Sequence, residues 1–368
     1  APGRTLLVHF TSWLSYLATG EWPETLWLEM LNQIPLSSAA AIAGLDALPL
    51  WEEFLGHFGD PVDSAWRKQH GLHDDLADLC APVLHIRSRD WIYAGVVDNA
   101  RLLQEEGCGG SAAPQHLALG IAEASGWFWG WSEEPDVYAD ELIDDFLAVY
   151  LAGAEDADVL PLATWYDAAA GKWQEIENPQ GTGVWTLHLA VSADWGGSLS
   201  VDQPADEAWA GMANDPVAVT EPCADQFNAL WFESAAVDAP AVVFGAIAFE
   251  LPVKADTPDA DVIVTLYEKD SEGEFHFIAT GGTKLSYREG GKPSGPVPTD
   301  TVVKASGALV AAAHEVAQGS TLVLGIAPQG CWTHDNPNTA EPIGFETDTL
   351  SGTLQIGTGG ALDSYLAL

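Results

Sequence analysis

The side chains with the spacing of a catalytic site follow two short apolar runs. Asp90 comes after the run Val83–Ile86 and a polar turn, and the run His116–Gly120 leads into the turn "IAEASG". An aspartate in the first place could orient a histidine in the second, which would act as a general base. The second turn holds no histidine, and Glu123 is its ionisable side chain. The pattern predicts an acid position without its base, and the alternative interpretation of Asp90 is an ordinary turn aspartate.

A serine nucleophile is the third group that such a site would need. It commonly lies in the pattern G-x-S-x-G, on a sharp turn between a strand and a helix. The pattern occurs nowhere in the 368 residues. The sequence therefore contains one member of a Ser-His-Asp site in a recognisable place.

Tryptophans lie beside both turns. Trp91 follows the candidate acid directly, and Trp127 and Trp129 belong to "GWFWGW" after the second turn. Aromatic rings in such loops could line an apolar or sugar-binding pocket. The alternative is packing in the core or at an interface, since large aromatic side chains dominate both.

Two acidic clusters could bind a metal ion. "QHGLHDD" contains His70 and His73, and "DTPDAD" contains Asp256, Asp259 and Asp261. The first is typical of a solvated loop and the second of turn chemistry, in which aspartate bonds nearby backbone groups. We expect no metal and no cofactor.

The four cysteines are Cys80, Cys108, Cys223 and Cys331, and none forms a C-x-x-C pair, which argues against a zinc site. An even number permits two disulfides, one within each half of the chain. The pair Cys223–Cys331 could join distant strands. Free buried thiols remain the alternative.

Charge excludes one class of partner. The chain has 54 acidic and 13 basic residues, for a net charge of −41. Nucleic-acid binding needs clusters of Lys and Arg, so it is not expected. The composition is typical of adaptation to high salt or of an acidic secreted protein, and an extracellular or cell-surface location is expected. No apolar run reaches the roughly 18 residues of a membrane span.

Hydrophobic periodicity divides the chain into three regions. Residues 1–80 have helical spacing, as in "ETLWLEMLNQIP". Residues 81–157 alternate strand, helix, strand and helix, which predicts part of a parallel α/β sheet. Residues 158–368 contain short apolar strands separated by Gly, Pro and Asp turns, which predicts an all-β sandwich, plausibly a jelly roll.

Several stretches together resemble the cocaine esterase and X-prolyl dipeptidyl-peptidase hydrolases. "APVLHIRSRDWIYAGVVDNARLL" is similar to the acid-bearing strand and helix of that family, and "PLWEEFLGHFGDPVDSAWRK" to the end of its helical cap. "DADVIVTLYEKDSEG", "GGTKLSYREG", "AAAHEVAQGSTLVLGIAP" and "HDNPNT" follow its C-terminal jelly-roll domain in order, and "SYLAL" resembles its closing strand.

The resemblance implies a partial α/β-hydrolase sheet (81–157) with a helical cap (1–80), followed by a jelly-roll β-sandwich (158–368). It implies serine hydrolysis of acyl esters, amides or Xaa-Pro peptides, and it places the triad acid at Asp90. Because the serine and the histidine are missing, we expect the chain to be inactive alone. A protein partner or a cleaved N-terminal segment would supply them and complete the sheet.

A second hypothesis is a non-catalytic binding or structural protein, a pseudoenzyme that keeps the scaffold and has lost the triad. The first residue, Ala1 rather than Met, favours processing and hence the enzyme hypothesis. A homo-oligomer is also compatible with a sheet of so few strands.

Overall fold

A computed structural model describes twelve segments of the chain. They are residues 65–70, 78–88, 95–110, 113–120, 135–154, 160–167, 172–176, 185–193, 195–214, 229–288, 295–328 and 352–368. Most of the region expected to form a helical cap lies outside these residues, and within it the structure describes helix α5 (Ala65–His70).

The first sheet alternates strands and helices, as its sequence periodicity predicts. In chain order its elements are β1 (Val83–Ser88), α6 (Gly95–Gly110), β2 (Gln115–Gly120), α7 (Pro135–Tyr150), β3 (Ala163–Asp167) and β4 (Lys172–Ile176). The strand order is β1-β2-β3-β4. β1, β2 and β3 are parallel because a helix lies between successive strands, and β4 returns antiparallel to β3 as a hairpin.

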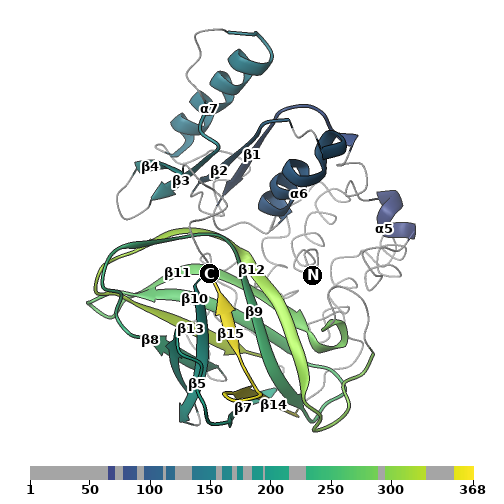
Figure 1. Cartoon of the computed structure of the whole chain (residues 1–368), viewed down its shortest axis with the longest axis vertical. Helices are drawn as coiled ribbons and strands as arrows, with labels where there is room; N and C mark the ends of the chain where they lie inside the picture. Colours follow the sequence, from purple (N-terminus) through teal and green to yellow (C-terminus); the bar gives the residue numbers. More distant parts are fainter. Residues whose placement is uncertain are drawn as a thin grey trace, which may run out of the picture.

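The two faces of this sheet are covered differently. On one face, Ala118 packs with Leu142 of α7 and with Leu160. On the other face, Trp165 of β3 packs with Ala313, which belongs to the second sheet. Figure 1 shows the small sheet with α6 and α7 beside the larger β domain. The small sheet is thus buried on both sides, as parallel sheets usually are.

The first sheet extends further along the chain than the expected boundary near residue 158. β3 and β4 begin after that point, yet β3 pairs with β2 from Leu117↔Ala163 to Leu119↔Trp165. The two strands are short, like several strands of the β domain, so local pattern did not assign them to a sheet. The hydrogen-bonding partner did.

The second sheet is a closed, barrel-like ring, and the β-rich C-terminal domain is confirmed. Its strands are β5 (Thr186–Ala193), β6 (Gly196–Ser200), β7 (Ala208–Asn214), β8 (Leu230–Ser234), β9 (Ala241–Ala255), β10 (Asp261–Lys269), β11 (Phe275–Lys284), β12 (Val303–Val316), β13 (Thr321–Ala327), β14 (Gly352–Thr358) and β15 (Tyr365–Ala367). A 3-10 turn, η4 (Leu285–Tyr287), follows β11.

Ring closure depends on the long strand β9. The order β12-β11-β10-β13-β8-β6-β5-β15-β9 closes on itself because β9 also pairs with β12. The C-terminal part of β9 pairs in addition with β14, which in turn pairs with β7. The expected sandwich is therefore built from one continuous sheet, with its two layers joined at the edges. Closure leaves fewer free strand edges than two separate sheets would.

Alternation along the strands fills the interior of the barrel. On β10, Val262, Val264 and Leu266 are all fully buried, whereas Ile263 between them is partly exposed and the buried Thr265 pairs its hydroxyl with that of Thr280. The segment "GALVAAAHEVAQG", which has a helix-like composition, lies in strand β12 and the turn after it. The expected hairpin at Glu272 and Gly273 is confirmed, with Gly273 at a φ of +90°.

Among the described helices, none combines the length and the apolar character needed to cross a membrane.

Candidate functional site

The carboxyl ends of β1 and β2 form one edge of the first sheet. Ser88, the last residue of β1, is in register with Gly120, the last residue of β2. The two segments that carry the predicted site residues therefore leave the sheet from neighbouring strand ends. Loops at this edge are the usual place for a functional site in a parallel α/β sheet.

The predicted site residues themselves lie outside the described part of the chain. This applies to the candidate acid Asp90, to Trp91, Trp127 and Trp129, and to Glu123 in the second turn. What the structure establishes is where the strands that lead into their segments end, with Ser88 in register with Gly120.

A carboxylate at the same edge was missed by the sequence analysis. Asp167 ends β3, two positions beyond Trp165, which pairs with Leu119 near the end of β2. Its side chain is 3% exposed, and the amide of Gln174 on β4 donates a hydrogen bond to it. The signal was an acid that ends the apolar run "ATWYD". Because its hydrogen-bonding partner lies across the β3–β4 hairpin, we interpret Asp167 as a residue that fixes this hairpin.

His116 lies near the amino end of β2, as its position before the apolar run predicts. It is 4% exposed. Nδ1 is 2.8 Å from the carbonyl oxygen of Pro161, which can only accept, so Nδ1 carries the proton. Nε2 then accepts the hydroxyl proton of Tyr150 at 2.8 Å. Both ring nitrogens are used, and His116 is a structural histidine that ties β2 to α7.

A second histidine in this sheet is also engaged in structural contacts. His85 of β1 donates from Nε2 to the side-chain oxygen of Gln115 at 3.0 Å, and the amide of Gln115 donates to the carbonyl of Ala113. Burial lowers the pKa of His85, and the hydrogen bond to Gln115 opposes this shift. The side chain links β1 to the start of β2.

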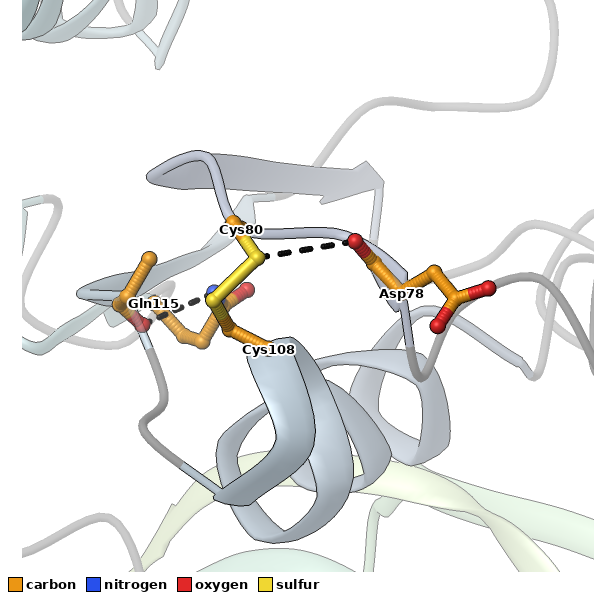
Figure 2. The surroundings of a disulfide bond; sticks show 5 residues. Asp78, Cys80, Cys108 and Gln115 are labelled. Carbon is orange, nitrogen blue, oxygen red and sulfur yellow. Dashed lines mark hydrogen bonds between the residues drawn. A yellow bond between two sulfur atoms is a disulfide. The ribbon is translucent and has the colours of Figure 1, made fainter.

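A disulfide joins the segment just before β1 to the C-terminal end of α6 (Figure 2). It connects Cys80 and Cys108, which are 28 positions apart. Cys80 Sγ also lies 3.6 Å from the backbone oxygen of Asp78. Of the pairings that the sequence left open, the one in the N-terminal half is confirmed. Cys223 and Cys331 lie outside the described residues, and their pairing stays a prediction.

The aspartates considered as calcium ligands have protein partners. Asp256 Oδ1 accepts the backbone N–H of Thr353 at 2.6 Å, and Asp259 Oδ1 accepts that of Ser286 at 2.8 Å. Lys284 Nζ is 3.4 Å from Asp261 Oδ2. In the part of the chain that the structure describes, no group of three or more His, Cys, Asp or Glu residues could hold a metal ion. These contacts are the turn chemistry that the sequence favoured.

A protein-family model matches the C-terminal part of the chain. The model described as X-Pro dipeptidyl-peptidase C-terminal non-catalytic domain matches residues 167–366. None of the curated proteins compared with the chain matches it.

Solved structures show the same fold. An aminopeptidase from a marine sediment Thaumarchaeota archaeon superposes with a TM-score of 0.70 at 17% identity, over 90% of this chain and 61% of its own. An alpha-amino acid ester hydrolase has a TM-score of 0.68 at 16% identity, over 89% and 61%. A CocE/NonD family hydrolase from Staphylococcus aureus has a TM-score of 0.68 at 16% identity, over 94% and 62%. The chain spans about three fifths of the length of these structures.

Proposed function

We propose that this chain is the C-terminal portion of a serine hydrolase. The premise is that the chain belongs to the X-Pro dipeptidyl-peptidase C-terminal non-catalytic domain family. The substrates would be acyl esters or peptides, the class handled by the enzymes it resembles. The family match covers the barrel and leaves the first sheet to be interpreted from its own geometry.

The observation that carries the proposal is the register of β1 and β2. Ser88 lies beside Gly120 at one sheet edge, although 32 positions separate these two strand ends in sequence, and they are the last described residues before Asp90 and before the turn of 121–126. A triad acid and its histidine need such neighbouring loops. The arrangement supports the interpretation of the first sheet as part of an α/β-hydrolase sheet with Asp90 as the acid.

Catalysis by the chain alone is not expected. The turn after β2 has no imidazole, and the sequence has no G-x-S-x-G. Losing members of a triad reduces turnover by about 10⁴-fold to 10⁶-fold, and the losses are not additive. The missing serine and histidine would come from an upstream segment or from a partner chain.

The edge of β1 is where such a segment would join. Among the described residues, β1 pairs with β2 on one side and with no strand on the other. An uncovered edge strand exposes a row of backbone donors and acceptors. We propose that strands of an upstream segment or partner occupy this edge. Size measurement by light scattering tests this, because a stable lone monomer of the 368-residue chain contradicts it.

A fluorophosphonate probe tests the proposed reaction. Applied to the protein as it occurs in its source cells, the probe should label a serine that peptide mapping places outside these 368 residues. The isolated chain should remain unlabelled and should not hydrolyse p-nitrophenyl esters or Xaa-Pro amides. Stoichiometric labelling of a serine within the isolated chain would contradict the proposal.

Substitution tests the role of the acid in the complete enzyme. Asp90→Asn should lower kcat about 10⁴-fold, because the histidine loses its orienting carboxylate. Asp78→Asn, at an exposed position before β1, is the matched control and should leave kcat unchanged. Equal activity of the two variants would remove Asp90 from the mechanism.

We also propose an extracellular or cell-surface location in an organism of saline habitat. The disulfide between Cys80 and Cys108 supports the location, since disulfides persist mainly in oxidising compartments. The net charge of −41 supports the habitat. Alkylating the thiols in intact cells before lysis checks the first point, because a fully alkylated Cys80 would place the chain in a reducing compartment.

A further inference from the structure

The C-terminal residues close the barrel. β15 lies between β5 and β9 and pairs antiparallel with both, Tyr365 being opposite His188 on one side and Glu250 on the other. In the strand order, β5 and β9 meet through β15. A strand of three residues at the end of the chain thus completes the ring.

Backbone hydrogen bonds extend this contact beyond the strand. Leu189 N–H donates to the carbonyl oxygen of Ser364 at 2.9 Å. Leu368 N–H donates to the carbonyl oxygen of Trp185 at 2.9 Å, and Trp185 N–H donates to the carbonyl oxygen of Leu368 at 3.1 Å. The last five residues are therefore held as a peptide would be held when it adds a strand to a sheet.

Side chains along this segment alternate between buried and partly exposed positions. Ser364 and Leu366 point inward and are fully buried, and Leu366 lies between its register partners Leu187 and Phe249. The Ser364 hydroxyl donates to the carbonyl of Gly357 at 2.5 Å.

The outward positions of the segment have different contacts. His188 Nδ1 donates to Asp363 Oδ1 at 2.6 Å. The Tyr365 ring lies 6.3 Å from the His188 ring, measured between centroids. The position between β5 and β9, called the groove below, therefore contacts the side chains of this segment as well as its backbone.

We propose that this groove is a peptide-acceptor site whose ligand is an extended segment of the pattern Asp-Ser-Tyr-Leu-Ala-Leu. Residues 363–368 of the same chain occupy it. Backbone pairing gives the affinity, and the buried positions of Ser364 and Leu366 give the specificity. The inference is independent of the hydrolase function.

A cleavable chain tests the proposal. A short protease recognition sequence is inserted between Gly360 and Ala361, which are exposed in the turn before β15. After cleavage, the C-terminal peptide should stay with the barrel through gel filtration, and an excess of fluorescent peptide DSYLAL should replace it with a stoichiometry of one. Loss of the peptide on cleavage without any rebinding of DSYLAL would overturn the proposal.

Matched peptides test its specificity. A peptide with Asp at the Leu366 position should bind about 100-fold more weakly or worse, because it places a charge in a buried apolar pocket. A peptide with Asp at the Ala367 position carries the same charge on the outward side and should bind within a few fold of the parent. Equal weakening of the two peptides would contradict a specific acceptor site.

The intact chain provides a measurement that needs no insertion. Leu366→Asp should remove the hydrogen-exchange protection of amides in β5 and in the paired part of β9, while Ala367→Asp should keep it. Protection that is unchanged in Leu366→Asp would show that the terminal strand does not hold the ring closed, and the proposal would fall.

Discussion

His314 Nε2 lies 2.6 Å from Glu268 Oε2, so that neighbouring parts of the barrel are joined by a hydrogen bond between β12 and β10. The Glu268 side chain is 6% exposed. Its other oxygen, Oε1, accepts the backbone N–H of Ala317 at 2.9 Å. One carboxylate thus connects β10 to the end of β12 and to the turn that leads into β13.

This pair makes the stability of the barrel depend on pH. Burial alone would raise the pKa of Glu268, but hydrogen bonds from His314, Ser320 and the backbone of Ala317 together lower it from 4.5 to about 2. A depressed pKa stabilises the fold fully above pH 4.5, and the contribution is lost as the pH falls towards 2. Urea unfolding across this window should show a loss of about 1–3 kcal/mol that Glu268→Gln abolishes. Glu272→Gln, an exposed carboxyl in the hairpin after β10, should keep the full pH dependence, and a flat profile for the wild type would contradict the assignment.

Reduction of the disulfide should destabilise the first sheet. Cys80–Cys108 closes a covalent loop that contains β1 and most of α6. For a separation of 28 residues, the chain-entropy model gives about 3–4 kcal/mol. The double variant Cys80→Ser, Cys108→Ser should unfold at lower urea concentration than the oxidised wild type. Dithiothreitol should leave the urea midpoint of the variant unchanged in the unfolding of the first sheet. Equal midpoints for the oxidised wild type and the variant would show that the bond carries no stability.

Removing His116 should cost stability, because its ring bonds both Pro161 and Tyr150 from a buried position. His116→Ala leaves a cavity and an unpaired carbonyl, and we expect a loss of about 2–4 kcal/mol. Tyr150→Phe removes one of the two hydrogen bonds and should cost about 0.5–1.5 kcal/mol. His276→Ala is the control, since His276 is exposed, and it should change stability by less than about 0.5 kcal/mol. A His116→Ala variant as stable as His276→Ala would contradict the structural role.

Salt should raise the melting temperature. The net charge of −41 produces repulsion that is screened over a Debye length of about 10 Å at 0.1 M salt. Thermal melts between low and molar sodium chloride should shift upward, and potassium chloride at equal ionic strength should produce the same shift if screening is the cause. A midpoint that is flat or falls with salt would remove the support for a saline habitat.

Local chemistry in the sequence determined several elements before any tertiary contact was known. The hairpin at Glu272 and Gly273 follows from a turn sequence between two alternating strands, and Asp270 fixes it by accepting the backbone N–H groups of Glu272 and Glu274. The strand–helix–strand order around β1 and β2 follows from a change in hydrophobic period. The charge likewise predicts, without reference to the fold, that nucleic acid is not a partner.

The tertiary structure decided which segments meet. Gly325 shows why: a Cβ atom there would lie 2.9 Å from the ring of Trp231, so the glycine accommodates a tryptophan on β8, almost 100 positions earlier. Cys80 likewise had three possible partners in the sequence and has one in the fold.

The closure of the barrel also separates what the sequence determines from what the tertiary structure decides. The sequence of residues 365–367 indicates a short strand, but nothing local specifies that it lies between β5 and β9, which begin more than 100 positions earlier. Alternation of side chains fixes which face of a strand is buried, because the period is a property of the strand itself. The choice of neighbour depends on backbone hydrogen bonds that any strand can make, and so only packing in three dimensions selects it.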